Sequence, residues 1–445
     1  MTTTVRTPGA GADAPAPGVL RSELPGGIRL VTESVPGVRS VSLGIWIGIG
    51  SRDETPEQAG AAHFLEHLLF KGTQRRSASG IAEEIDAVGG ELNAFTAKEH
   101  TCYYAHVLDS DVALGIDLLA DVVTDARLAH ADTELERGVV LEEIAMRDDD
   151  PEDLLGELFD EALFGDHPLG LPIVGSEESV RGMSRETLHT FWRSEYTTPR
   201  MVVAAAGNLS HPALEDLAAA ALSAAASRTG EDAAPVPPRR GGTRPVAGGS
   251  LALHSDDTEQ AHLLLGVPGI DRHDPRRRAL AVLNAALGGG LSSRLFQQVR
   301  EQRGLAYSVY SSTASYADAG SLSVYAGCAP ERLGEVAGVV RDVLADVARD
   351  GLSTAELVRA QGSLRGGLVL GSEDTPSRMN RIGRSELDHG RQRSLTESLD
   401  GIAAVTADEV AAVARDLLSQ PLTAAVVGPF DEIEDLPAAL RELSG

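Results

Sequence analysis

The sequence predicts an α+β protein made of two related halves joined by a linker. Strand-like runs of alternating apolar and polar residues are interleaved with helical runs in the first half of the chain. The composition then shifts over residues 226–249, which are rich in Pro, Gly and charged side chains and therefore predict a linker. After this linker the same pattern restarts, which indicates an internal duplication.

The order of the predicted elements sets the domain boundaries. In the first half, residues 21–225, strands are predicted at 28–33, 40–48, 92–96, 103–108 and 201–207, and helices at 61–70, 78–88, 110–124, 132–146, 152–164 and 186–196. In the second half, residues 250–445, strands are predicted at 251–254, 262–267, 306–316 and 321–327, followed by long helices. Residues 1–20 are predicted to be a disordered tail, because they are rich in Thr, Ala, Pro and Gly and lack the apolar core of a signal peptide.

The first predicted helix carries the most informative pattern of the chain. His63, Glu66 and His67 spell H-x-x-E-H, the inverted form of the H-E-x-x-H zinc-protease signature. Positions i, i+3 and i+4 share one face of a helix, so both imidazoles and the carboxylate face the same space. Two imidazoles on a metal ion, beside a carboxylate able to deprotonate water, are the minimum for metal-assisted hydrolysis. The alternative is an amphipathic helix with two surface histidines, and the apolar neighbours of His63 and His67 argue against it.

Catalytic zinc usually keeps three protein ligands, and a later helix offers the third. Glu136 and Glu143 lie two turns apart on one face of this helix, whereas Glu142 points elsewhere. Asp132 or Thr133 is expected to cap the helix. Helix geometry alone leaves open whether these acids are metal ligands or solvated surface charges.

The second half repeats the segments of this site without their chemistry. Segment 65–69 aligns with 283–287, and segment 134–137 aligns with 356–359. The duplication therefore predicts one half that binds metal and one that has lost the site. The residues that replace His63, Glu66, His67, Glu136 and Glu143 are, in that order, Ala281, Asn284, Ala285, Val358 and Arg365.

The composition excludes several classes of function. The formal charge of −27 argues against binding to nucleic acid, because no basic stripe could offset it. No run of 18 apolar residues occurs, so no membrane span is expected. Cys102 and Cys328 are the only cysteines, which excludes a disulfide framework. We therefore expect a cytoplasmic protein without nucleic-acid or membrane partners.

These motifs resemble the insulinase (pitrilysin) family of zinc peptidases, in particular its mitochondrial-processing-peptidase-like bacterial subfamily. The resemblance covers residues 27–428 and includes the H-x-x-E-H motif and an Asn-Ala-Phe-Thr segment beside the metal. Glu143 stands 76 positions after His67, at the spacing of the family's third ligand, and Glu136 matches a supporting glutamate seven positions earlier. The resemblance implies two homologous α/β-sandwich halves, each a mixed and mostly antiparallel sheet with helices packed on it, which together enclose a cavity.

The resemblance also implies a role for each residue of the metal site. His63, His67 and Glu143 would hold one Zn²⁺ per chain, although Mn²⁺ or Co²⁺ could support activity with such ligands. Glu66 would act as the general base. Glu136 would orient a ligating histidine.

The Asn-Ala-Phe-Thr segment is expected to bind substrate. Asn93 and Ala94 should lie on an edge strand, to which an extended peptide could add through backbone hydrogen bonds. Phe95 is expected either to shape a side-chain pocket or to belong to the core.

Two motifs of the second half are predicted to reach the substrate. By resemblance, Gly288, Gly289 and Gly290 would form a flexible loop that meets the substrate. The alternative is a plain turn between helices. A nucleotide site is disfavoured because the loop lacks the Lys-Ser/Thr of a P-loop. Arg300 and Tyr307 match an Arg and a Tyr that the family aims at the active site, where they would stabilise negative charge on the scissile carbonyl oxygen. Without the resemblance, they would be a surface helix residue and a strand residue.

The motifs together predict a zinc-dependent endopeptidase that hydrolyses unfolded peptides or presequence-like segments in a closed chamber. If the acidic residues line that chamber, basic or neutral peptides would be preferred; the alternative is a generally acidic surface. Because the chain carries all of these motifs itself, we expect a self-sufficient homodimer or monomer, and the resemblance favours the homodimer. The alternatives are a half-enzyme or a structural subunit that is active only in a heterodimer with a paralogue, and the complete ligand set favours the enzyme.

Overall fold

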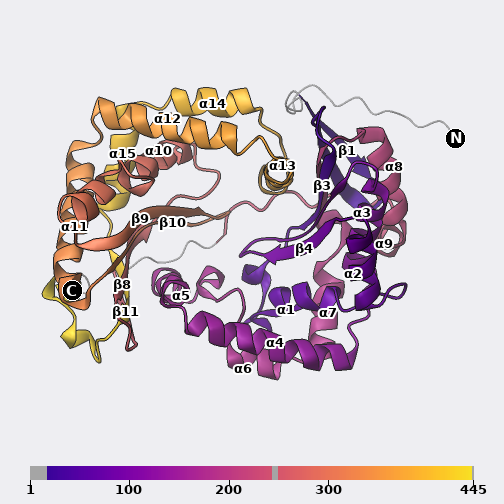
Figure 1. Cartoon of the computed structure of the whole chain (residues 1–445), viewed down its shortest axis with the longest axis horizontal. Coiled ribbons are helices and arrows are strands. Elements are labelled where there is room, and N and C mark those ends of the chain that lie inside the picture. The colour runs from indigo at the N-terminus through magenta and orange to yellow at the C-terminus, as the bar shows by residue number, and fades with distance from the viewer. Residues whose placement is uncertain (1–17, 243–248, 443–445) are drawn as a thin grey trace.

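The protein contains two β-sheets, each covered by its own helices (Figure 1). The computed structural model describes residues 18–242 and 249–442. The first sheet has the strand order β1-β2-β6-β3-β5-β4, and the second has the order β7-β11-β8-β10-β9. The strands of the first sheet are β1 (Val19–Leu24), β2 (Ile28–Ser34), β3 (Ser40–Ile47), β4 (Glu91–Thr96), β5 (Thr101–Leu108) and β6 (Met201–Gly207). Those of the second are β7 (Leu251–Ser255), β8 (Ala261–Pro268), β9 (Ala306–Ser315), β10 (Gly320–Cys328) and β11 (Thr423–Gly428).

The two sheets share one topology, which confirms the predicted fold class of two homologous halves. Strands β2, β6, β3, β5 and β4 correspond in order to β7, β11, β8, β10 and β9. Each sheet has one parallel pair, β2 with β6 and β7 with β11, and its other pairs are antiparallel. Strand β1 is an addition at the edge of the first sheet.

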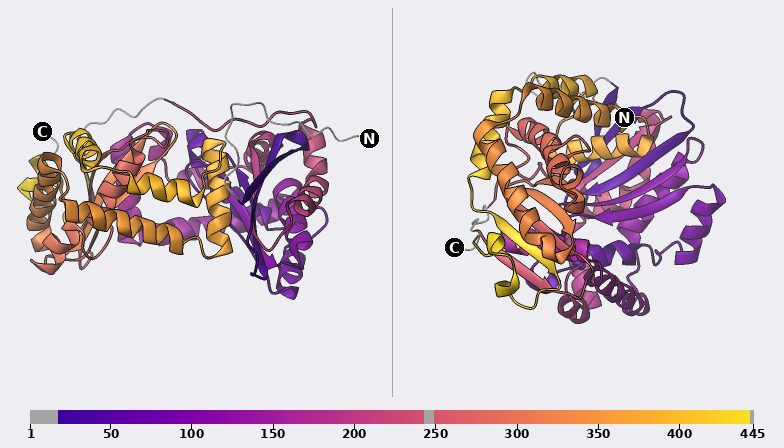
Figure 2. Two further views of the ribbon diagram at one scale, coloured as in Figure 1. Left: turned by 90° about the horizontal axis from the view of Figure 1, so that it is seen from above. Right: turned by 60° about the vertical axis from the view of Figure 1, so that its left-hand side comes forward.

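Helices cover both faces of each sheet, and the buried apolar residues form four clusters: a large core in each half and a smaller cluster on the opposite face of each sheet. Figure 2 shows α12 and α14 running from the second half toward α13. The helices of the first half are α1 (Ala61–Leu69), α2 (Ala78–Ala87), α3 (Val112–Asp125), α4 (His130–Asp148), α5 (Pro151–Phe164), α6 (Glu177–Gly182), α7 (Arg185–Glu195), α8 (His211–Ala221) and α9 (Ser223–Thr229). Those of the second half are α10 (Arg277–Gly288), the π-helix η6 (Phe296–Glu301), α11 (Leu333–Asp350), α12 (Thr354–Leu370), α13 (Thr375–His389), α14 (Leu395–Ala403), α15 (Ala407–Leu418) and α16 (Ala438–Arg441).

The halves exchange one helix each. Helix α5 of the first half packs on β7, β8 and β11, and α13 of the second half packs on β2, β3 and β6. Each exchanged helix approaches a glycine of a central strand. A Cβ on Gly266 would lie 2.6 Å from Phe159 of α5, and a Cβ on Gly44 would lie 2.7 Å from the sulfur of Met379 of α13. The exchange means that neither sheet is fully covered without the other half.

Equivalent hairpin turns of the two sheets meet at the junction. Arg52 donates two hydrogen bonds of 2.9 Å to Asp318, which follows β9, and also pairs with Glu99, which precedes β5. The same Glu99 carboxylate accepts a hydrogen bond of 3.2 Å from the backbone N–H of Ala317. These three charged side chains are all buried, so the junction is a fixed, desolvated ion network.

Several boundaries differ from the sequence-based prediction. Val19 and Leu20 pair with β2 instead of belonging to a tail, and residues 1–17 lie outside the described part of the chain. Helix α9 continues to Thr229, so the predicted linker begins four residues too early; 243–248 also lie outside the described residues. Strand β11 was not predicted, because its six residues are all buried and therefore show no alternation.

The expected cap of α4 is also wrong. The helix begins at His130, after Ala129, and not at Asp132 or Thr133. The Thr133 hydroxyl instead donates a hydrogen bond of 3.1 Å to the carbonyl of Ala129 inside the first turn. Thr133 therefore lies one turn beyond the N-cap position, and its hydroxyl bonds back to the helix backbone instead of capping the helix.

None of the helices in the described ranges combines the length and the apolar character that a bilayer crossing requires. Cys102 and Cys328 are buried as free thiols in different sheets.

We predict that Phe159→Ala destabilises the whole chain. Phe159 is 3% exposed where α5 lies on the second sheet, and truncating a buried Phe costs about 3–5 kcal/mol. The measurement is the free energy of unfolding from urea denaturation. Glu161→Ala, on the exposed side of the same helix, is the control, and a loss in Phe159→Ala no larger than in this control would contradict the exchange.

Candidate metal centre

Helix α1 presents the H-x-x-E-H motif because its other faces are buried. The helix starts after Gly60, which has a φ of +92°, and the carboxylate of Glu54 accepts hydrogen bonds of 2.7 Å from the backbone N–H groups of Gly60 and Ala62. Burial raises the pKa of Glu54 to about 8, and the hydrogen bonds from these two N–H groups oppose the rise. Six of the nine residues of α1 are buried in the first core, namely Ala61, Ala62, Phe64, Leu65, Leu68 and Leu69.

His63, His67 and Glu143 converge as the motif predicts. Oε2 of Glu143 lies 3.5 Å from Nε2 of His63 and 3.4 Å from Nε2 of His67. One ligand atom from each residue lies within 4.8 Å of the others, and no other group of three His, Cys, Asp or Glu side chains in the described residues meets this condition. Glu143 comes from α4, so two helices build the centre.

The donor set fits a divalent metal ion. Nε2 of His63 and Nε2 of His67 both face the same carboxylate oxygen of Glu143. Burial, with a smaller effect of the neighbouring His67, lowers the pKa of His63 to about 4. The imidazole is therefore neutral at pH 7, which is the form that binds a metal. Two imidazoles and one carboxylate match a three-ligand zinc site with an open position.

Glu136 lies behind His67, as predicted for a residue that orients the ligand. Its carboxylate is 2% exposed, and Oε2 lies 3.4 Å from Nδ1 of His67. The other oxygen, Oε1, accepts from the ammonium of Lys71 at 2.6 Å. The two oxygens of Glu136 therefore have separate partners on the segment that contains α1.

Glu66 is held by a neighbour that the sequence analysis did not single out. The hydroxyl of Thr96, at the end of β4, donates a hydrogen bond of 2.6 Å to Oε2 of Glu66. Burial raises the pKa of Glu66, and the bond from Thr96 opposes this rise. A carboxylate with a raised pKa is better suited to hold a proton during a reaction at neutral pH.

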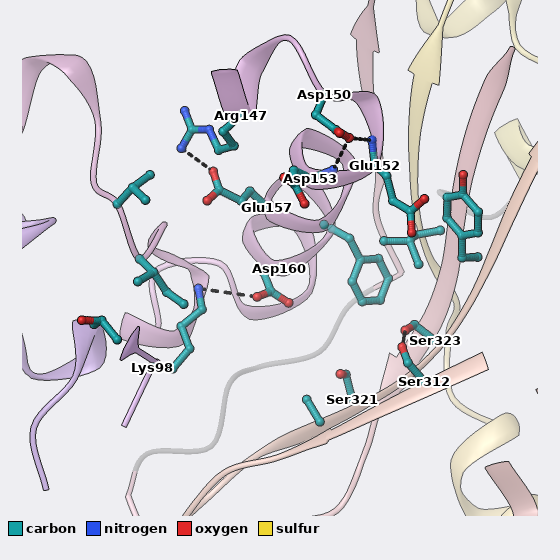
Figure 3. Close-up of a pocket in the computed structure, with 18 of the residues that line it drawn as sticks. Lys98, Arg147, Asp150, Glu152, Asp153, Glu157, Asp160, Ser312, Ser321 and Ser323 are labelled. Carbon is teal, nitrogen blue, oxygen red and sulfur yellow. Dashed lines mark hydrogen bonds and ion pairs between the residues drawn. The ribbon is translucent and has the colours of Figure 1, made fainter. Parts of the chain in front are cut away.

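A cavity of about 990 Å³ opens beside these residues and reaches the second sheet. Both His63 and Glu66 line it, as do Tyr310 and three serines of the second sheet. Figure 3 shows the acidic side chains of α5 and its N-terminal cap on one side of the space and Ser312, Ser321 and Ser323 on the other. The acidic residues that line the cavity are Glu66, Glu143, Asp150, Glu152, Asp153, Glu157 and Asp160.

The cations of the cavity do not balance this charge. Lys98 and Arg147 are the only Lys and Arg side chains among the described lining residues. Lys98 lies 3.5 Å from Asp160, and Arg147 lies 2.6 Å from Glu157. The wall therefore has a net negative charge, as the acidic-chamber interpretation expects.

Strand β4 is an edge strand, as predicted for Asn93 and Ala94. Of the predicted substrate segment, Phe95 lines the cavity, together with Thr96, while Asn93 and Ala94 do not. Phe95 also makes an edge contact with the buried Trp46, with ring centroids 5.6 Å apart. It therefore fits both sequence-based alternatives, pocket and core.

The motifs of the second half do not line the cavity. Gly288 ends α10 against β9, where a Cβ would lie 2.2 Å from the backbone nitrogen of Ser311, and Gly289 and Gly290 border a small pocket beside α12. Their contact with substrate remains a prediction.

Arg300 and Tyr307 contact each other instead of the metal centre. The guanidinium of Arg300 lies 4.8 Å from the ring centroid of Tyr307, whose side chain is 77% exposed. Arg300 sits in the π-helix η6, and Tyr307 sits at the register shift between β9 and β10. Both irregularities are frequent at functional sites because they redirect side chains.

The second copy of the site makes one hydrogen bond between its helix and its sheet that is similar to one at the metal centre. Asn284 of α10 replaces Glu66, and its side-chain oxygen accepts a hydrogen bond of 2.7 Å from Ser311 of β9. This bond resembles the one from Thr96 to Glu66. None of the five residues that replace the metal-site residues in this copy is a His, Cys, Asp or Glu, so the copy offers no metal site.

Sequence reasoning missed Glu54, Lys71, the bond from Thr96 to Glu66 and the acidic face of α5. Two of these have a signal in the sequence: Thr96 ends the Asn-Ala-Phe-Thr segment, and Lys71 and Lys98 are the only two lysines of the chain. The others depend on contacts between segments far apart in the chain.

Two family models match most of this chain. A model described as "Insulinase (Peptidase family M16)" matches residues 29–177, and one described as "Peptidase M16 inactive domain" matches residues 182–364. An uncharacterized zinc protease of Mycobacterium tuberculosis is 57% identical over 440 residues, which is 99% of each chain. Another from Bacillus subtilis is 40% identical over 405 residues, 91% of this chain and 96% of its own.

Solved structures show the same fold. A structure from Pseudomonas fluorescens, titled as a peptidase M16 inactive domain, has a TM-score of 0.83 at 22% identity and covers 93% of this chain and 98% of its own. A protease from Helicobacter pylori has a TM-score of 0.82 at 20% identity, covering 92% and 99%.

We predict that His63 makes the metal-free protein less stable in acid. Because its folded-state pKa is lowered to about 4, the unfolded chain binds the proton first, and stability falls as the pH drops from about 6.5 toward 4. Between pH 7 and pH 5 the wild type should lose about 2 kcal/mol more than His63→Gln. Urea unfolding at both pH values measures this difference. Replacing an exposed histidine, His189→Gln, is the control, and an equal loss in His63→Gln and wild type would contradict the prediction.

Proposed function

The chain belongs to the insulinase family of peptidases, M16, and from this premise we propose that it is a zinc-dependent endopeptidase that cleaves unfolded peptides. The observation that carries the proposal is the convergence of His63, His67 and Glu143 beside Glu66 at one large cavity. The relatives named as zinc proteases support the choice of metal and reaction.

Three side chains would hold the metal. His63 and His67 would bind through Nε2, the atoms that face Glu143, and Glu143 would bind through its carboxylate. Zinc held there supplies Lewis-acid chemistry, because it lowers the pKa of a water to about 7 and polarises a carbonyl group.

Glu66 would move the proton during hydrolysis. Its carboxylate lies at the cavity wall and accepts a bond from Thr96 through Oε2, which leaves Oε1 for the attacking water. Glu66 would take a proton from this water and pass it to the leaving amine. Thr96 would keep the carboxylate in position throughout the transfer.

The cavity favours an unfolded and basic substrate. An extended peptide can add to the free edge of β4 through backbone hydrogen bonds, which needs no particular sequence. Asn93 and Ala94 lie on that edge. The net negative charge of the wall attracts basic peptides such as presequence-like segments.

We predict that Glu66→Gln retains zinc and loses turnover. The amide keeps the shape of the side chain but cannot take the proton, and removing a general base costs roughly 10²–10⁴-fold in rate. The measurements are zinc content per chain and cleavage of two quenched fluorogenic peptides of equal length, one basic and one acidic. We expect about one zinc in both proteins, and faster cleavage of the basic peptide by the wild type.

The controls separate the metal from the base. His63→Gln should lose zinc and activity together, because it removes a ligand. Near-normal activity in Glu66→Gln would contradict the role of Glu66. Zinc binding by the wild type without cleavage of either peptide would favour the alternative of a subunit that needs a paralogous partner.

We also propose that the active form is a homodimer in which a second copy supplies Arg300 and Tyr307. Within one chain these two residues do not line the cavity, and the side chain of Tyr307 is largely exposed. A phenol is a useful hydrogen-bond donor to a developing oxyanion. In a twofold dimer each chain would complete the site of its partner.

We predict that two inactive variants complement each other if this dimer forms. Glu66→Gln and Tyr307→Phe damage different ends of the proposed shared site. After mixing and subunit exchange, a heterodimer has one intact site, so the mixture should recover about one quarter of wild-type activity. The measurement is the peptide cleavage rate of the mixture. A mixture of Glu66→Gln and His63→Gln should stay inactive, because both changes lie in the same half; an inactive first mixture would mean that Tyr307 does not act across a dimer.

A further inference from the structure

Both lysines of this chain lie at the candidate site. The sequence has 39 Lys and Arg residues, and all except Lys71 and Lys98 are arginine. Lys98 lines the cavity and donates to the carbonyl of Leu171 at 2.6 Å. Lys71 pairs with Glu136 behind the metal centre. A chain that otherwise uses arginine for positive charge therefore has an ammonium group at these two places.

Lys71 shares the carboxylate of Glu136 with a metal ligand. Its backbone N–H donates to Leu68 at 3.1 Å, so it directly continues the turn that ends α1. Lys71 follows His67 by one helical turn, and both side chains reach Glu136 on α4. The ammonium occupies Oε1 at 2.6 Å, and Nδ1 of His67 faces Oε2 at 3.4 Å.

Glu136 needs a fixed orientation to serve His67. The side chain of Glu136 is buried. Among the described residues, Lys71 and His67 are the only basic side chains within ion-pair distance of it. A buried carboxylate that loses its cation is strongly disfavoured and rearranges to find another partner. Lys71 thus prevents Glu136 from turning its oxygens away from Nδ1 of His67.

An ammonium fits this place better than a guanidinium. Lysine presents a compact charge that engages a single oxygen, whereas the planar fork of arginine pairs with both oxygens of a carboxylate. An arginine at position 71 would compete with His67 for Oε2. This difference gives a physical reason why residue 71 is a lysine in a chain that otherwise, apart from Lys98, uses arginine.

We propose that Lys71 is a positioning residue of the metal centre, which acts through Glu136 on His67 by holding one carboxylate oxygen and leaving the other for the imidazole. The inference rests on the proposed function, because it assumes that His67 binds zinc. It assigns Lys71 no contact with metal or substrate.

The test is the zinc dissociation constant of the full chain, measured by competition with a chromophoric chelator. Loss of an outer partner of a metal ligand typically weakens metal binding by about 10–100-fold, so Lys71→Met should weaken it by about tenfold or more. Lys71→Gln provides a second neutral variant, and thermal melting of the metal-free proteins shows whether each is folded. Lys71→Arg should stay weaker than wild type. Arg75→Met is the matched control, because Arg75 is in the same loop and pairs with Asp117 and Asp121 instead of Glu136.

A double-mutant cycle separates this role from a general effect of charge. In the Glu136→Gln background, Lys71→Met should cause no further loss of zinc affinity, because its effect passes through the missing carboxylate. Wild-type affinity in folded Lys71→Met, or an equal loss in both backgrounds, would overturn the inference. Wild-type affinity in Lys71→Arg would overturn the single-oxygen arrangement. A wild-type chain that binds no zinc would instead overturn the proposed function, and the inference with it.

Discussion

The burial of one short helix governs the candidate site. Helix α1 places six of its nine residues in the first core, so the helix cannot rotate without exposing them. This constraint fixes the directions of His63, Glu66 and His67 at once, since i, i+3 and i+4 share a face. Helix α4 then needs only one half-buried carboxylate, Glu143, at the right height to complete the three candidate ligands.

The surroundings of α1 are built from polar groups that each hold one atom of the site. Thr96 takes one oxygen of Glu66, and Glu136 faces Nδ1 of His67. Because such contacts are made in a largely buried setting, an unpartnered group costs more there than at the surface. The site is therefore prepared before substrate enters, which is where a protein contributes most to electrostatic catalysis.

The two halves depend on each other although only one carries the candidate metal ligands. Their exchange of α5 and α13 lets the second sheet form a wall of the cavity, while α5 brings its acidic side chains to face that sheet. The buried network of Arg52, Glu99 and Asp318 fixes the junction at the equivalent hairpin turns. The half without candidate ligands thus shapes the space in which the other half would act.

The sequence by itself determined the two-half fold and the helical face of His63, Glu66 and His67. These features follow from local periodicity and from the order of strands, which a linear pattern records. Only the tertiary structure decided which sheet α5 covers, that Thr96 reaches Glu66, and that Arg300 and Tyr307 lie away from their own cavity. Periodicity reports that a helix has an apolar side but not which surface buries it, and a hydrogen bond between distant segments leaves no spacing in the sequence. The seven acids of the cavity show the same limit, because a charge of −27 indicates how many acids there are and not where they gather.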